Sequence, residues 1–148
     1  MAKKIIISIV AIAVIVGCFF AGKGLYMQYN SKRADHFYEL GAQYYNDTKE
    51  FEKAKVAFQK SLHYSLRNPP LKLKYLPYKH PQIVVMAKYG LALTYAQLKE
   101  YTNAISLLRQ LLEEEATRLL GVGGLPSRKE IENNLQSAIR ALEKENSQ

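Results

Sequence analysis

The 148-residue sequence contains no tryptophan and only one cysteine, Cys18, which excludes an internal disulfide. The three histidines, His36, His63 and His80, fall in different predicted elements, and Cys18 lies in an apolar run away from any base. This pattern indicates neither a thiol nucleophile nor a metal site. We therefore expect a protein that is not an enzyme and that uses no cofactor.

Acidic residues are missing from a long central stretch, since none occurs between Glu52 and Glu100. The formal net charge is +8: residues 53–99 carry +9, whereas residues 1–52 carry +1 and residues 100–148 carry −2. Such a block predicts a basic surface that attracts anionic lipid, nucleic acid or an acidic protein. A solvated surface that only aids solubility explains the same pattern.

The longest uncharged run is Ile5–Gly22, which is eighteen residues long. A helix of this length spans about 27 Å, close to the hydrocarbon thickness of a bilayer. A signal-peptide cut after Ala21 would place the bulky Phe19 at the −3 site, which disfavours cleavage. We expect residues 1–22 to be an uncleaved, single-pass transmembrane anchor.

Cys18 suggests a second form of membrane attachment. The run Ile15-Val16-Gly17-Cys18 resembles the bacterial lipobox, in which the chain is cut before a cysteine that then carries lipid. This resemblance implies lipidation of Cys18, although two phenylalanines follow it and the apolar run continues beyond the cut. A cleaved, soluble form is the third alternative.

Basic residues flank the predicted span on both sides, so the orientation depends on their density. Lys3 and Lys4 directly precede the span and favour a cytoplasmic amino end, with the helical domain in the periplasm or outside. Residues 23–33 are expected to form a short link whose tyrosines suit the headgroup region. The first helix of the domain is predicted to begin at about Ser31, which would be its N-cap.

A pattern of aromatic, small and proline residues follows this link: Phe37, Leu40-Gly41, Tyr44, Ala54, Phe58 and Pro69. It resembles the tetratricopeptide repeat, a pair of antiparallel helices. A weaker echo occurs later in the chain: Leu91-Ala92, Tyr95, Ala104 and Leu108. We expect the small residues Gly41, Ala54, Ala92 and Ala104 to be buried, because helices approach closely only at small side chains.

The spacing of the two patterns defines an insertion. Leu40 and Leu91 are 51 residues apart, whereas a tetratricopeptide unit has about 34 residues, so about sixteen are inserted. Leu40 to Ala54 is 14 residues and Leu91 to Ala104 is 13, so the first turn carries one extra residue. Four of the chain's prolines fall in residues 67–81 and exclude a continuous helix there.

Residues 67–81 also carry four basic side chains, Arg67, Lys72, Lys74 and Lys79. A basic, extended segment can lie along a partner or add to the edge of a partner's sheet. A spacer that packs over the helix ends is the alternative. Further along, a glycine-rich loop is predicted at 121–127, and the capping box Ser127-Arg-Lys-Glu130 opens a last amphipathic helix.

The predicted fold is all-α: a superhelix of two tetratricopeptide-like helix pairs with a C-terminal capping helix, preceded by one transmembrane helix. It divides the chain into an anchor (1–22), a link (23–33), a first repeat (34–66), a basic insertion (67–81), a second repeat (82–120), a loop (121–127) and a capping helix (128–145).

The resemblance implies binding of a protein partner in the groove that the first helix of each pair faces. The residues that it places in this groove are Tyr38, Ala42, Tyr45, Tyr89, Leu93 and Gln97. Family members that hold chaperone C-termini use Lys and Asn at such positions to clamp a carboxylate. Tyr38 and Ala42 stand there in this chain, so we do not expect that class of ligand.

We therefore predict a membrane-tethered scaffold, assembly factor or accessory subunit of a membrane protein complex. Arrays of this kind usually need about three repeats, so a protein partner or a second copy is expected to complete the module. The first alternative is a pilotin-like bacterial lipoprotein that assists secretion or pilus assembly. The second is a basic module that binds lipid or nucleic acid, of which nucleic acid fits a membrane-tethered chain less well.

Overall fold

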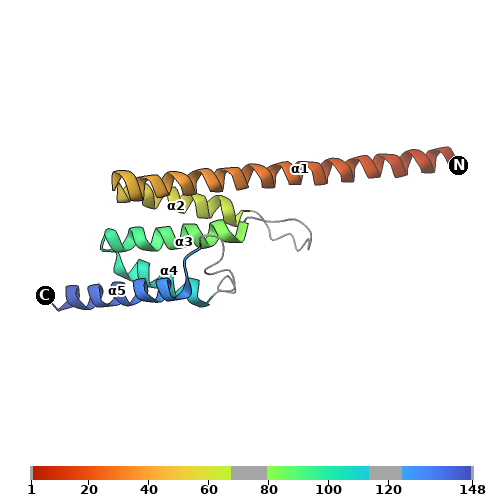
Figure 1. The fold of residues 1–148 in the computed structure, drawn as a ribbon. Coiled ribbons are helices and arrows are strands. Elements are labelled where there is room, and N and C mark those ends of the chain that lie inside the picture. Colours follow the sequence, from red (N-terminus) through yellow and green to blue (C-terminus); the bar gives the residue numbers. More distant parts are fainter. Residues whose placement is uncertain (1, 68–79, 114–124, 148) are drawn as a thin grey trace.

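The computed structural model describes residues 2–67, 80–113 and 125–147, and all regular structure in these ranges is helical. Each helix packs antiparallel against the one before it, so that the helices stack in chain order (Figure 1). Their bounds are α1 (Ala2–Gln43), α2 (Phe51–Leu66), α3 (His80–Gln97), α4 (Tyr101–Glu113) and α5 (Arg128–Asn146). The prediction of an all-α fold is confirmed.

Helix α1 is longer than the sequence indicated, because it continues without a break through the predicted link at 23–33. Ser31 lies inside α1, so its prediction as an N-cap is wrong. Met27, Asn30 and Ala34 follow one another at helical spacing and are all buried. Their packing holds this segment helical, and the Ser61 hydroxyl fixes the same region by donating to the carbonyl of Ala34 at 2.8 Å.

The turns that join α1 to α2 and α3 to α4 repeat one design. Each contains a lysine in the left-handed backbone region, Lys49 (φ 55°) or Lys99 (φ 62°). A glutamate follows each lysine, and its carbonyl accepts from the N–H of the buried alanine four residues later, at 2.9 and 3.1 Å. The two helix pairs therefore carry structurally equivalent turns.

The extra residue predicted for the first turn is accommodated as a turn of π-helix, η1 (Tyr44–Thr48). In the second turn the N–H of Glu100 donates to the carbonyl of Tyr95, five residues earlier, at 2.8 Å. In the first turn the N–H of Glu50 donates to the carbonyl of Tyr44, six residues earlier, at 3.0 Å. A π-helical turn holds one more residue than an α-helical turn and so absorbs the insertion.

The ring of Phe58 on α2 lies between a glycine of α1 and a glycine of α3. A Cβ atom at Gly41 would lie 2.8 Å from Cδ1 and Cε1 of this ring, and a Cβ atom at Gly90 would lie 2.6 Å from its Cζ. Side-chain carbons do not approach this closely, so both positions require glycine. Phe58 is 2% exposed, and its ring joins the first helix pair to the second.

All four small residues of the repeat pattern are buried as predicted: Gly41, Ala54, Ala92 and Ala104. The largest group of buried residues lies farther along the stack, where α3, α4 and α5 meet, and includes Val85, Leu108, Leu111, Ile131 and Leu135. Helix α5 begins as predicted, because the Ser127 hydroxyl accepts from the N–H of Glu130 at 3.2 Å. This helix covers the apolar side of the second pair.

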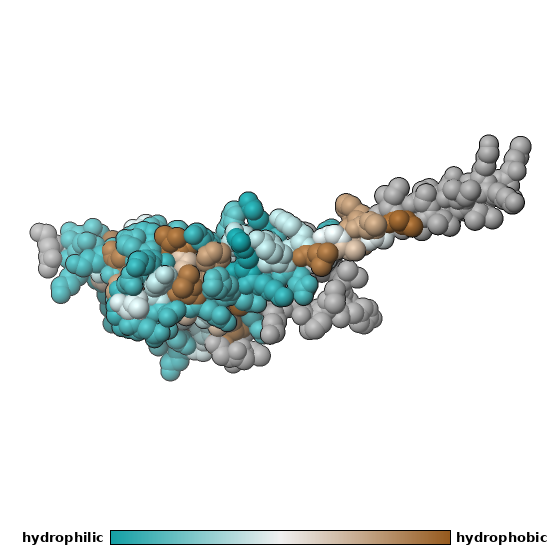
Figure 2. Space-filling view, turned by 90° about the horizontal axis from the view of Figure 1, so that it is seen from above, coloured by the Kyte–Doolittle hydropathy of each residue, from teal (hydrophilic) through white to brown (hydrophobic). Residues whose placement is uncertain are grey.

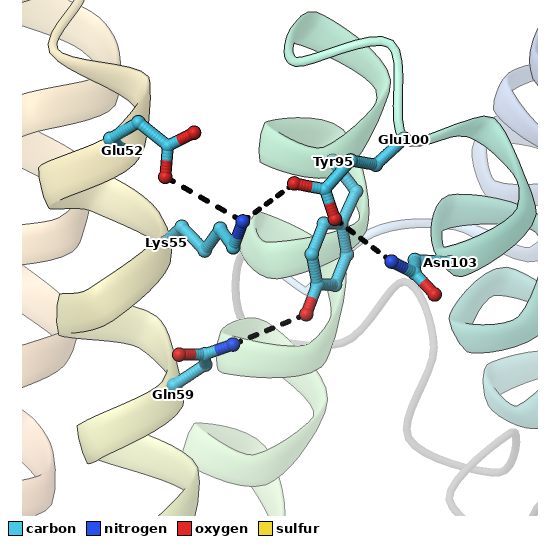
Figure 3. Close-up of polar contacts among 6 residues, drawn as sticks. All are labelled: Glu52, Lys55, Gln59, Tyr95, Glu100 and Asn103. Carbon is cyan, nitrogen blue, oxygen red and sulfur yellow. Dashed lines mark hydrogen bonds and ion pairs between the residues drawn. The ribbon is translucent and has the colours of Figure 1, made fainter.

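Polar side chains fasten α2 to the second helix pair at the edge of the apolar contact (Figure 3). The Lys55 ammonium lies 2.5 Å from a carboxylate oxygen of Glu100, and its interaction lowers the pKa of Glu100. Gln59 donates to the hydroxyl of Tyr95 at 3.2 Å. Asn103 holds the second oxygen of the Glu100 carboxylate at 2.8 Å.

The amino-terminal part of α1 projects beyond the stack, at the end where α2 finishes and α3 starts (Figure 1). Apolar side chains are exposed on the described part of this projection, including Val14, Phe19, Phe20 and Leu25 (Figure 2). Within the described residues, no helix has a stretch that is both long and apolar enough to cross a membrane. Most side chains of the predicted anchor lie outside the described part, so the anchor stays a prediction.

We predict that Gly41→Ala lowers the free energy of unfolding by about 1–3 kcal/mol, since a methyl group there overpacks the Phe58 ring. The measurement is thermal or urea unfolding of the full chain in a nonionic detergent. Gly24→Ala is the matched control: it lies in the same helix, and a Cβ atom there would meet nothing within 4 Å. Equal effects of the two variants would contradict the packing role of Gly41.

Candidate functional site

A concave groove runs across the faces of α1, α3 and the start of α5. The first of its two cavities has a volume of about 240 Å³. Five of the six residues that the sequence placed in a partner groove line this one cavity: Tyr38, Ala42, Tyr45, Tyr89 and Leu93. The structure thus brings together side chains that are about fifty residues apart in the sequence.

The sixth predicted residue, Gln97, lies in an adjoining cavity of about 270 Å³. Tyr45 and Leu93 line both cavities, so the two form one continuous depression. Asn134 and Ser137 of α5 border its far end. The groove is therefore built from the first helix of each pair together with the capping helix.

The hydroxyl of Tyr89 connects the groove wall to α5. It donates to the Glu130 carboxylate at 2.8 Å and accepts from the side-chain amide of Asn134, also at 2.8 Å. Partial burial raises the pKa of Tyr89, and the hydrogen bond to Glu130 raises it further. Burial also raises the pKa of Tyr38. Both tyrosines therefore stay neutral at physiological pH and offer an aromatic ring with a polar tip.

Aromatic and apolar side chains line the groove together with a smaller set of polar ones: Asn46, Gln97, Glu130, Asn134 and Ser137. Among the residues that the structure describes, no lysine or arginine lines either cavity, and Glu130 is the one charged residue in their linings. Tyrosine rings provide large contact areas at a small cost in conformational entropy, and aromatic residues are enriched in the cores of protein interfaces. Such a groove suits a protein segment with apolar or aromatic side chains, and its described lining offers no cation to hold a terminal carboxylate.

Several residues of the groove were missed by the sequence analysis. Leu125 and Pro126 lie in the predicted loop, and both are buried and line the first cavity. Glu130 was predicted to serve only the capping box, whereas its carboxylate accepts from Tyr89. An apolar residue just before a capping box often packs onto the helix that follows, and this signal could have identified the Leu125-Pro126 pair.

Of the other predicted binding residues, the structure describes Arg67 and Cys18. Arg67 is exposed directly after the end of α2. Lys72, Lys74 and Lys79 lie outside the described residues, so the basic segment stays a prediction. Cys18 is exposed on the projecting part of α1. Among the described residues, no group of three or more His, Cys, Asp or Glu side chains could hold a metal ion.

No family model matches the sequence, and neither a curated protein nor a solved structure gives a significant match.

We predict that Tyr89→Phe loosens α5 from the stack, because it removes two hydrogen bonds and leaves the Glu130 carboxylate without this donor. The free energy of unfolding should fall by about 0.5–1.5 kcal/mol, with the largest loss of amide exchange protection in α5. Tyr45→Phe is the control, since the Tyr45 hydroxyl forms no hydrogen bond with the described residues. Unchanged protection of α5 in Tyr89→Phe would contradict this role.

Proposed function

We propose that this chain is a membrane-tethered, tetratricopeptide-like module that binds a segment of another protein in the groove formed by α1, α3 and α5. It acts as a scaffold, assembly factor or accessory subunit of a membrane protein complex. The observation that carries the proposal is the convergence of Tyr38, Ala42, Tyr45, Tyr89 and Leu93 on one cavity.

Internal repetition supports the tetratricopeptide-like interpretation. The two helix pairs share the small buried residues and the turn design, and they stack through Phe58 as adjacent repeats would. Helix α5 then takes the place of the solubilising helix that ends such arrays. Its outward side chains are polar or charged, which suits a terminal position.

The membrane tether is supported by the uncharged run Ile5–Gly22 and by the apolar side chains that are exposed on the described part of the α1 projection (Figure 2). Because α1 continues into the stack without a break, the tether and the groove share one helix. A module held in this way keeps a fixed orientation relative to the bilayer. Its partner is therefore expected close to the same membrane, outside the cytoplasm.

The basic central block is partly neutralised by ion pairs within the chain. Two of its described lysines already have carboxylate partners within the chain, Lys53 with Glu50 and Lys55 with Glu100. A nucleic-acid surface needs cations that are free to contact phosphates. These ion pairs reduce the number of cations with which the block can contact the phosphates of a nucleic acid.

Ala42→Glu tests the groove directly, because it places a carboxylate where an apolar partner segment would be desolvated. The recovery of copurifying partners after detergent extraction should fall at least about tenfold, with the unfolding temperature unchanged. Gln43→Glu is the matched control, since it adds the same charge at the next, exposed position of α1. Equal recovery with both variants would contradict binding in the groove.

The bacterial lipoprotein remains the alternative, and the exposed position of Cys18 on α1 is compatible with it. Mass spectrometry of the mature amino terminus separates the two forms. We predict an intact Met or Ala start, as expected for an uncleaved anchor. A chain that begins with a lipid-modified Cys18 would replace the anchor with a pilotin-like attachment.

A further inference from the structure

The first helix pair has a second cavity on its outer side, away from α3. It has a volume of about 390 Å³ and lies between α1 and α2. Its lining is mainly apolar or aromatic, with charged side chains at the rim: Phe37, Leu40, Tyr44, Val56, Ala57, Glu52, Lys53 and Lys60. None of the α1 residues in this cavity lines the groove, which uses the neighbouring positions Tyr38, Ala42 and Tyr45.

The equivalent surface of the second helix pair is already occupied. The shared turn design aligns Leu40 with Leu91 and Tyr44 with Tyr95, and the buried alanines of α2 and α4 align likewise. Leu91 and Tyr95 pack in one cluster with Phe58 of α2. Leu91 is 4% exposed as a result, whereas Leu40 is only partly buried. Leu91 is therefore more buried than Leu40 because α2 covers it.

The polar edge of the occupied surface is also repeated. On the second pair, Lys55 and Gln59 of α2 reach Glu100 and the hydroxyl of Tyr95 (Figure 3). On the first pair the equivalent positions are Glu50 and Tyr44. The outer surface thus offers a similar apolar centre, with Glu50 and Tyr44 at its edge, to a helix that resembles α2. The Glu50 carboxylate already pairs with Lys53, as that of Glu100 already accepts from Asn103.

We propose that this surface binds an amphipathic α-helix of a different protein, which lies against α1 and α2 as α2 lies against α3 and α4. The partner helix presents a ridge of three residues spaced four positions apart: a small residue, an aromatic residue and a leucine. Ala54, Phe58 and Leu62 form such a ridge on α2. The hydrogen-bond donors of the partner helix follow one position later, like Lys55 and Gln59. This site is separate from the groove and takes a helical partner.

A second copy of this chain does not supply such a ridge by head-to-tail stacking. In the corresponding ridge of α2, Ala54 and Phe58 are buried within its own stack and Leu62 is partly buried there. The opposite end of the stack is closed by α5, whose outward residues are polar or charged, including Glu132, Asn133, Gln136 and Arg140. The occupant is therefore a helix from another protein.

The direction of the bound helix follows from the same equivalence. Helix α2 runs antiparallel to α3 (Figure 1), so the partner helix runs antiparallel to α1. Its carboxyl end then points to the side from which α1 projects. This last point rests on the proposed tether, and it places the carboxyl end of the partner helix toward the membrane.

The test uses a fluorescently labelled synthetic peptide with the sequence of residues 50–67, which carries the required ridge. Binding to the full chain in a nonionic detergent is measured by fluorescence anisotropy. Saturable binding is expected, and it should weaken at least about tenfold in Leu40→Gln and in Val56→Glu, which alter the cavity. Val56 is 48% exposed, so its variant keeps the fold, and unfolding temperatures verify this.

Two controls separate this site from other surfaces. Leu66→Gln makes the same change at a leucine that is 67% exposed and outside the cavity, and it should bind the peptide like the wild type. Ala42→Glu, which alters the groove, should also leave the affinity unchanged, so that failure of the groove proposal is distinguished from failure of this one. The inference is overturned by absent or non-saturable binding, by equal affinity in Val56→Glu, or by a wild-type dimer that Val56→Glu converts to monomer.

Discussion

The ring of Phe58, held between Gly41 and Gly90, is the contact on which the arrangement of the two helix pairs depends. It reaches from α2 to α1 on one side and to α3 on the other, where neither backbone leaves room for a side chain. Protein interiors are packed closely enough that one added methyl group is felt. A single aromatic residue therefore determines the distance at which the pairs stack.

Two surfaces result from this stacking. On one side, α1, α3 and α5 come together and form the groove around the predicted tyrosines. On the outer side of the first pair, the surface that α2 covers on the second pair is repeated without a covering helix among the described residues. Both surfaces arise because the same kind of helix pair occurs twice in the chain, and α5 covers one end of the stack.

The sequence predicted the features that depend on local pattern. The buried positions of Gly41 and Ala54, the extra residue of the first turn and the Ser127 cap all follow from spacing and residue type. Features that depend on contacts between distant segments were missed. The packing of Met27, Asn30 and Ala34 keeps α1 helical past Ser31, where local propensity favoured a start. The carboxylate of Glu130 accepts from Tyr89, a residue on another helix.

The role of Phe58 can be measured most directly by a double-mutant cycle between Gly41→Ala and Phe58→Leu. Leucine lacks the ring atoms that the new methyl group would meet, so it should relieve the overpacking that Gly41→Ala causes. We predict that the double variant is more stable than the sum of the single changes by at least about 1 kcal/mol. Additive changes in the free energy of unfolding would show that Gly41 and Phe58 do not act together, and would contradict the account of how the two helix pairs are joined.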